Sequence, residues 1–418
     1  MSAHHSSVDT ASQALREGRI TPREYYTPRG STRAGTIRWA HAGWITLASS
    51  IILSLVGVYA IDLTAGVSAT GLGYHAKRQL IFLGVGILAC CVATIPSAKL
   101  LRQLAPLLVI GSGALLVFVL VPFVPEVLVA PRNGARRWIS LGFTDFQPSE
   151  LAKIAYVLSV SLYLRKRKNH RTLLGLMVPA LITLVPMGLI VLEPDLGTAL
   201  LFMPTLFAML VAAGARLWHL ALIVVVLGAS APAMYPMLKP HQKQRIRAMV
   251  NQITGDTSEA DGINYQGFKS MTLVGAGGVV GMDATLSRAV VDFNELPEDH
   301  NDMVFAVIIN RFGLLGGLIV MALYLAWVGG ALWVSSGCRD AFARLVCVGL
   351  AALIASQAVF NMGIAVGLLP VTGMTLPFVS YGGTSLVSVY VMTGIIIAIA
   401  MRREAPLVRE SFEFSDDH

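Results

Sequence analysis

Carboxylates crowd together in the stretch NELPEDHNDMVFAVI at residues 294–308. Glu295, Glu298 and Asp299 precede Asp302, and an apolar run begins directly after that residue. A carboxylate beside a low-dielectric boundary and other carboxylates holds its proton more tightly than in water, which suits a general base. Asp302 is therefore a candidate general base. The alternative is that Asp299 or Asp302 only caps the helix that follows.

A second polar group belongs to NGARRWISLGFTDFQPSELAK, residues 133–153. Arg136 and Arg137 are planar cations of the type that binds phosphate. Trp138 could stack on a sugar ring, or it could lie in the aromatic belt at a membrane interface.

Further charged residues fall at the ends of predicted helices. Glu150 and Lys153 share a helix face, where an ion pair allows both to be buried; the pair could be purely structural. The EPDLGT turn at 193–198 could bind a cation, or its aspartate could cap the next helix. Residues 361–386 contain prolines and glycines that break helical periodicity. Irregular backbone at membrane depth survives only inside protein or along a cavity, so we expect this segment to line one.

The elements that must position these residues are membrane-spanning helices. Apolar residues make up 55% of the 418 residues and charged residues 13%, and the mean hydropathy is +0.66. A soluble domain carries roughly a quarter charged residues, so this chain could not cover a water-facing surface. Stretches of about 20 apolar residues predict an all-α, polytopic integral membrane protein with about ten transmembrane helices. The predicted spans are 42–62, 79–96, 103–125, 148–164, 172–192, 198–215, 217–236, 303–330, 343–366 and 382–401.

Basic residues predict the orientation of these helices. The net charge is +8, but the cations lie between apolar runs, where they hold helices at a negatively charged inner surface, so we expect no nucleic-acid partner. Their distribution favours both termini inside. Residues 1–40 are then a cytoplasmic tail before a signal-anchor helix, and 41–403 are the ten-helix domain. Residues 237–300 form a large outer loop between helices 7 and 8, expected to be a flexible cover or partner surface, and 404–418 a cytoplasmic tail.

The cysteines predict no cross-linked framework. Cys90 and Cys91 fall mid-span, whereas Cys338 and Cys347 fall in or beside a predicted inner loop. None lies in the large outer loop, and their spacing matches no metal motif. We therefore expect neither disulfides nor a metal site made by the protein.

Together these motifs resemble the SEDS family (shape, elongation, division and sporulation), whose best-known members are FtsW, RodA and SpoVE. The resemblance runs from about Trp44 to Arg403. Its motifs, in the family's order, are NGARRWISLG…QPSELAK, EPDLGTA, YQ followed by GAGGVVG, LPEDHND and LLPVTGMTLPFVSYGGTSL. The resemblance implies a peptidoglycan glycosyltransferase. Such enzymes polymerise lipid II, a disaccharide-pentapeptide on undecaprenyl pyrophosphate, outside the bacterial cytoplasmic (inner) membrane.

The resemblance also implies residue roles. The family's essential aspartate lies in an H-T-D-F segment that matches HNDM, which assigns it to Asp302, and the family's functional tryptophan matches Trp138. The expected substrate-binding residues are Trp138, Arg136, Arg137, Lys153, Glu150, Arg245, Lys269, Ser380 and Tyr381. Some of these cations should hold the pyrophosphate, a role that a divalent cation, Mg²⁺ or Mn²⁺, could assist.

This chain departs from the family pattern around the expected base. Asn301 and Met303 replace the usual threonine and phenylalanine, and Asn310-Arg311 stands where the family usually has two glutamates. A cation inside a span needs a partner, so Arg311 is the departure with the largest consequence. NGARRWI and the polar N-terminal tail look like FtsW, whereas GLLPVTG looks more like RodA; we favour the FtsW type and a role in division.

The expected reaction is inverting, with no covalent enzyme intermediate. The implied partners are a class B penicillin-binding transpeptidase and proteins of the division or elongation complex. One alternative is an elongation polymerase with the same chemistry. Another is a lipid II flippase or transporter, and a third is a scaffold that would tolerate loss of Asp302.

Overall fold

The computed structural model describes most of the chain from residue 41 onward. The described residues are 41–66, 71–129, 131, 135–142, 144–166, 172–234, 236, 243–244, 247, 250, 265–296 and 299–402. All of them belong to one compact unit, Arg38–His418. The two predicted tails, Glu298 and the expected phosphate ligand Arg245 lie outside the described residues.

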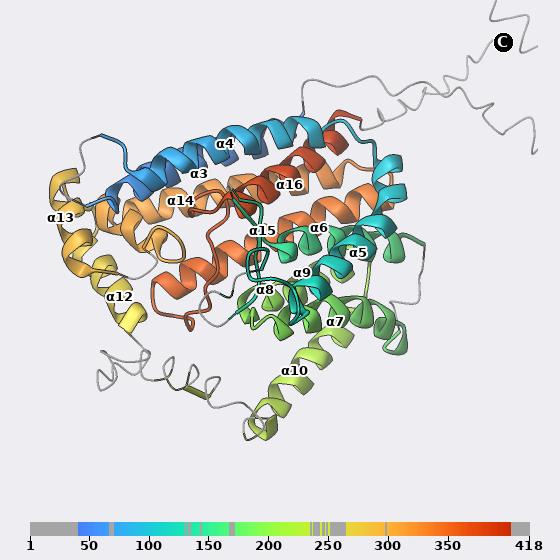
Figure 1. Ribbon diagram of the computed structural model, residues 1–418. Helices are drawn as coiled ribbons and strands as arrows, with labels where there is room; N and C mark the ends of the chain where they lie inside the picture. The colour runs from blue at the N-terminus through green and yellow to red at the C-terminus, as the bar shows by residue number, and fades with distance from the viewer. Residues whose placement is uncertain are drawn as a thin grey trace, which may run out of the picture. The chain divides into compact units, whose positions relative to one another are not determined.

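Helices dominate the described part of the chain (Figure 1). The first half contains α3 (Gly43–Leu63), α4 (Tyr74–Ala93), α5 (Ala98–Leu120), α6 (Pro148–Lys166), a 3₁₀ turn η2 (Leu174–Leu176) and α7 (Met177–Leu192). The second half contains α8 (Leu196–Leu200), α9 (Phe202–Ala212), α10 (Leu217–Met234), α12 (Tyr265–Gly277), α13 (Ala284–Asn294), α14 (Val304–Ser336), α15 (Ala341–Ala365) and α16 (Gly383–Met401). Two short strands, β1 (Ile139–Ser140) and β2 (Asp145–Phe146), pair antiparallel between α5 and α6. The predicted all-α class is confirmed.

Seven helices in the described part are long and apolar enough to cross a membrane: α3, α4, α5, η2 with α7, α14, α15 and α16. The remaining predicted spans fall on α6, on the apolar pair α8–α9 and on α10. Helix α6 carries Glu150, Lys153, Arg165 and Lys166, and α8–α9 is shorter than the others. A polytopic membrane protein is therefore confirmed, with every predicted span on a helix.

Helix α14 contains a break at Gly313. Gly313 has φ +69° and ψ −170°, which is not helical. An unbroken helix of 33 residues would be about 50 Å long, far more than the ~30 Å hydrocarbon core. Residues 314–336 alone measure about 34 Å. The candidate span is Val304–Ser336, which begins where the sequence predicted, and the break at Gly313 divides it into residues 304–312 and 314–336.

The large outer loop contains structure that the sequence did not predict. Helices α12 and α13 form a hairpin that packs against α14, with further contacts to α15 and α3. The side chain of Asp283 caps α13 by accepting a hydrogen bond from the Thr285 backbone N–H. A flexible cover is thus wrong for residues 265–296.

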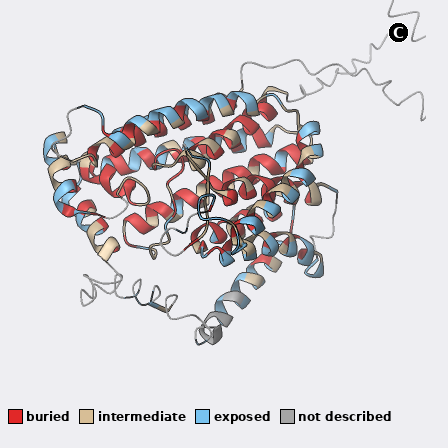
Figure 2. Ribbon diagram, viewed as in Figure 1, coloured by how far each residue is buried: buried red, intermediate tan, exposed pale blue. Residues whose placement is uncertain are grey.

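Buried side chains concentrate where α14, α15 and α16 pack with α3, α4 and α6 (Figure 2). Two side-chain hydrogen bonds there join buried polar groups: the Trp327 indole N–H donates to Ser50, and the Tyr390 hydroxyl lies 3.0 Å from the Ser54 hydroxyl. By contrast, α5 and α7 expose many large apolar side chains, which suits contact with lipid.

Candidate functional site

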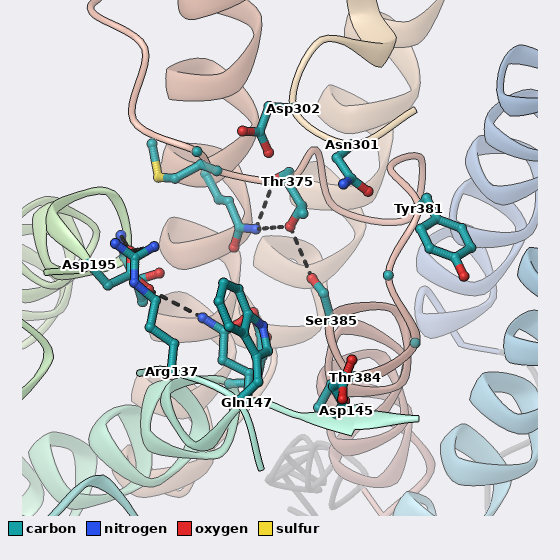
Figure 3. Close-up of a pocket in the computed structure, with 18 of the residues that line it drawn as sticks. Arg137, Asp145, Gln147, Asp195, Asn301, Asp302, Thr375, Tyr381, Thr384 and Ser385 are labelled. Carbon is teal, nitrogen blue, oxygen red and sulfur yellow. Dashed lines mark hydrogen bonds and ion pairs between the residues drawn. The ribbon is translucent and has the colours of Figure 1, made fainter. Parts of the chain in front are cut away.

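A cavity of about 710 Å³ lies between segments that are far apart in the sequence. Its walls come from the start of α4, residues 135–147, α6, α8, the 301–302 turn and residues 371–385. Figure 3 shows Asp302 above the Thr375–Ser385 pair, with Arg137 and Asp195 on one side and Tyr381 on the other. The irregular segment 361–386, predicted to line a cavity, contributes residues 371–375 and 381–385 to the lining.

Asp302 lies in the turn that precedes α14, and this turn is held by its main chain. Three successive carbonyl oxygens accept hydrogen bonds from other elements. The carbonyl of His300 accepts from the Tyr381 backbone N–H at 2.9 Å, and that of Asn301 accepts from the Ser380 hydroxyl at 2.5 Å. The carbonyl of Asp302 accepts from the Asn361 side-chain amide at 2.8 Å. The turn is therefore fixed to the 376–382 segment and to α15.

The Asp302 carboxylate faces Gly373. A Cβ added at Gly373 would lie 3.5 Å from Asp302 Oδ2, and Gly373 has φ +76°, a conformation that favours glycine. Asn361 also donates to the carbonyl of the neighbouring Met374 at 2.6 Å. One buried amide thus joins the Asp302 turn to the cavity wall opposite it.

Lys153 and Glu150 form the predicted ion pair inside the cavity wall. The Lys153 ammonium lies 2.9 Å from Glu150 Oε1 and 3.1 Å from Gln357 Oε1. Lys153 is 1% exposed and Glu150 4%, so each charge depends on its partner. Gln357 then donates to the Thr375 carbonyl. The pair is structural and lines the cavity at the same time.

Arg137 fixes the EPDLGT turn against the cavity. Its Nε donates to the Glu193 carbonyl at 2.9 Å, and its Nη2 donates to the Pro194 carbonyl. Its guanidinium carbon also lies 6.0 Å from the centre of the Trp138 ring. Arg137 therefore orients Trp138 and the turn while it lines the cavity.

Asp195 has the capping role that the sequence offered for this turn, and it also lines the cavity. Its Oδ1 accepts from the Thr198 backbone N–H, which is a helix cap. Its Oδ2 accepts from the Gln147 side chain at 3.2 Å, and the residue lines the cavity. Neighbouring Glu193 is 1% exposed, and its carboxyl oxygens have no hydrogen-bond partner among the described residues. Burial, and secondarily Asp195, raises the pKa of Glu193 to about 8, against the opposing effect of Arg137.

The structure brings most of the predicted site together. Asp302, Trp138, Arg137, Lys153, Glu150 and Tyr381 all line the cavity. Ser380 is buried behind it and holds the Asn301 carbonyl. Arg136 does not line the cavity, because its guanidinium donates to the carbonyls of Pro122 and Val124.

Lys269 is also absent from the lining residues. Its ammonium lies 5.2 Å from the centre of the Tyr265 ring on α12. Substrate contact by Arg136 or Lys269 would therefore require a change in these interactions.

Sequence reasoning missed several lining residues: His75, Arg78, Gln147, Gln357 and Thr375. His75 stacks on His300 with ring centres 4.4 Å apart, and Tyr381 meets the edge of both rings. Of these residues, Gln357 could have been recognised from the sequence, because a polar amide inside an apolar span must find hydrogen-bond partners. His75 and Arg78 lie in the first turns of α4, just before the predicted span 79–96.

A divalent cation finds no ready-made protein site in the described part of the chain. No three His, Cys, Asp or Glu side chains lie close enough there to hold a metal ion. Among the cavity carboxylates, Glu150 is paired with Lys153, and Asp195 is engaged by Gln147 and Thr198. These two carboxylates are therefore already engaged by protein partners.

Comparison with known proteins points to one family. Residues 40–405 match the family model described as a cell cycle protein, FtsW/RodA/SpoVE. The chain is 30% identical over 380 residues, 89% of this chain and 99% of the relative, to "Probable peptidoglycan glycosyltransferase FtsW" of Coxiella burnetii. It is 33% identical over 329 residues to "Stage V sporulation protein E" of Bacillus subtilis, covering 78% of this chain and 87% of the relative.

Solved structures agree with this match. One chain belongs to a structure described as "Structural coordination of polymerization and crosslinking by a peptidoglycan synthase complex"; the TM-score is 0.73 at 29% identity, covering 86% of this chain and 98% of that one. Another is the rod shape determining protein RodA of Thermus thermophilus, with a TM-score of 0.62 at 26% identity, covering 87% and 97%. The fold and nearly the full length are therefore shared.

Proposed function

The chain belongs to the FtsW/RodA/SpoVE family of cell cycle proteins, and on that premise we propose that it is a peptidoglycan glycosyltransferase. It polymerises lipid II into glycan strands at the outer face of the bacterial cytoplasmic membrane during cell division. The observation that carries this proposal is the single cavity in which Asp302, Trp138, Arg137 and Lys153 meet. A carboxylate, an aromatic ring and cations are what a sugar pyrophosphate substrate requires.

Asp302 is the general base in this proposal. Its carboxylate takes the proton from the acceptor sugar hydroxyl while that oxygen attacks the anomeric carbon of the donor. The new glycosidic C–O bond forms as the bond between the anomeric carbon and the pyrophosphate oxygen breaks. The lipid pyrophosphate leaves with the electron pair. An α-linked donor then gives a β-linked product by inversion, without a covalent enzyme intermediate.

Cations on the cavity wall stabilise the leaving pyrophosphate. Arg137 is held in place by two carbonyls, and Lys153 is held by Glu150 and Gln357, so neither needs to reorganise during the reaction. Arg78 lines the opposite end of the cavity, beside His75 and Tyr381. Trp138 offers a ring face on which a sugar can stack.

The partner and the location follow from the same proposal. A solved relative comes from a peptidoglycan synthase complex in which polymerisation and crosslinking are coordinated, which supports a class B penicillin-binding transpeptidase as partner. The apolar helices support a multi-pass membrane protein. We place the cavity on the extracytoplasmic side of the inner membrane, where the long polar loop lies.

The proposal is tested with the purified full chain in liposomes that carry lipid II in the outer leaflet only. The wild type should make glycan strands without an energy source, whereas Asp302→Ala should make none. Asp292→Asn is the matched control, because Asp292 is an exposed carboxylate outside the cavity lining, and it should keep wild-type activity.

Two results would contradict the proposal. Strand synthesis by folded Asp302→Ala would remove Asp302 as the base. Movement of lipid II between leaflets without any polymerisation by the wild type would identify a flippase instead.

A further inference from the structure

The helical segment of α14 before the break at Gly313 has nine residues, 304–312, and is called the rod below. Different parts of the molecule hold its two ends. At the Asp302 end, the three carbonyl contacts described above fix the turn to α15 and to residues 376–382. At the other end lie Asn310 and Arg311, which the proposed reaction does not use. The contacts of Asn310 and Arg311 therefore determine the orientation of the rod.

Asn310 joins the rod to both helices of the α12–α13 hairpin. It is fully buried. Its side-chain amide donates to the Leu273 carbonyl of α12 at 3.2 Å, and its Oδ1 accepts from the Ser287 hydroxyl of α13 at 2.8 Å. Ser287 is also fully buried, so water cannot replace this bond easily.

Arg311 joins the rod to the hairpin turn and to α3. Its Nη1 donates to the Met282 carbonyl at 2.6 Å, and its Nε donates to the Tyr59 hydroxyl at 3.1 Å. Its guanidinium carbon also lies 4.9 Å from the centre of the Phe312 ring. The hydrogen-bond partners of this cation among the described residues are therefore a carbonyl and a hydroxyl, and the Asp283 carboxylate lies near enough for its charge to interact with Arg311.

The main chain of the hairpin turn inserts into the break of α14. Leu314 N–H donates to the Gly278 carbonyl at 2.9 Å, and Met282 N–H donates to the Arg311 carbonyl at 3.2 Å. A Cβ at Gly281 would lie 2.3 Å from the Arg311 carbonyl oxygen. This close approach leaves the rod little freedom to move without the hairpin.

We infer that Asn310 and Arg311 are positioning residues, which transmit the position of the α12–α13 hairpin to Asp302 through the rod. The inference rests on the proposed function, in which Asp302 is the base. The rod rises about 1.5 Å per residue, so Asp302 lies about 12 Å from Asn310 along it. A tilt of the rod at Asn310 therefore changes the position of Asp302. A glutamate at either position could not donate to the carbonyls of Leu273 and Met282, so the amide and the guanidinium are specific to this arrangement.

The test measures kcat and KM for lipid II with the full chain in liposomes. Asn310→Leu, Ser287→Ala and Arg311→Lys should each lower kcat by about ten-fold or more, since a 1 Å misplacement can cost 10²-fold, and should leave KM within about two-fold. Ser287→Ala removes one Asn310 bond from the α13 side without altering the rod. Asn310→Asp keeps the acceptor for Ser287 and should recover part of the lost kcat.

Thr272→Val is the matched control. Thr272 lies on the same hairpin, but its hydroxyl bonds within α12, to the Phe268 carbonyl at 2.8 Å, so kcat should not change. If Asn310→Leu does not fold by size exclusion and thermal unfolding, Ser287→Ala and Arg311→Lys decide the matter. Wild-type kcat in these two, or a rise in KM alone, overturns the inference. An inactive wild type, or an active Asp302→Ala, overturns the proposed function instead.

Discussion

At the scale of the residue, the side chains that place Asp302 differ from those that line the cavity. Asn361 and Ser380 hold the main chain of its turn, while Arg137 and Lys153 present charge. Asp302, Trp138 and the Glu150–Lys153 pair could be predicted, because charged and aromatic residues at helix ends stand out in an apolar chain. Asn361 could not, because its partners lie 59 and 13 residues away and no local pattern marks them.

Glu193 gives a prediction about pH. In the unfolded chain its carboxyl releases a proton near 4.5, whereas the folded protein holds that proton up to a pKa of about 8. Unfolding therefore releases a proton between these values, and stability falls as the pH rises through this window. Glu193→Gln should flatten this fall, so that the melting temperature of the variant exceeds that of the wild type by several degrees at pH 8 and matches it near pH 4.5. Equal pH dependence in both proteins would contradict the raised pKa.

At the scale of the element, the spans were predictable and the breaks were not. Apolar length located the seven helices of the described residues that are long and apolar enough to cross a membrane, because lipid imposes that length. The break at Gly313 lies inside an apolar run, where one glycine carries no distinct signal. Helices α12 and α13 are short, and they depend on docking to α14 for stability, so a polar loop was the natural but wrong expectation.

The docking of the hairpin can be tested at Gly281. It has φ +88°, and an added Cβ would clash with the Arg311 carbonyl, so Gly281→Ala should destabilise the protein by about 2 kcal/mol or more. Gly278→Ala is the matched control, since Gly278 also has a positive φ, +55°, but a Cβ there meets nothing within 4 Å. Thermal unfolding should show a clearly larger loss for Gly281→Ala. Equal losses would mean that backbone strain alone, and not the close approach, sets the cost.

At the scale of the whole molecule, the proposed orientation places the hairpin and the loop before α15 on opposite sides of the membrane. The distribution of basic residues favours this arrangement. The orientation could be inferred from the sequence because the uneven distribution of Lys and Arg between loops does not depend on how the helices pack.

Cysteine labelling checks the orientation in spheroplasts, in a chain whose four native cysteines are replaced by serine. Val280→Cys, 75% exposed on the hairpin turn, should react with a membrane-impermeant maleimide added outside. Arg339→Cys, at an exposed position between α14 and α15, should react only after permeabilisation. The reverse pattern would invert the topology and place the cavity inside.

The three carbonyl contacts on the Asp302 turn have an evolutionary consequence. A main-chain carbonyl accepts its hydrogen bond whichever side chain its residue carries. These three contacts therefore depend on the number of residues in the turn. Another side chain at Asn301 would therefore leave these three contacts unchanged. An insertion or deletion of one residue between His300 and Val304 would shift every contact by one position. The carbonyl contacts thus constrain the length of the turn, while the stacked His300 and the buried Met303 constrain its side chains.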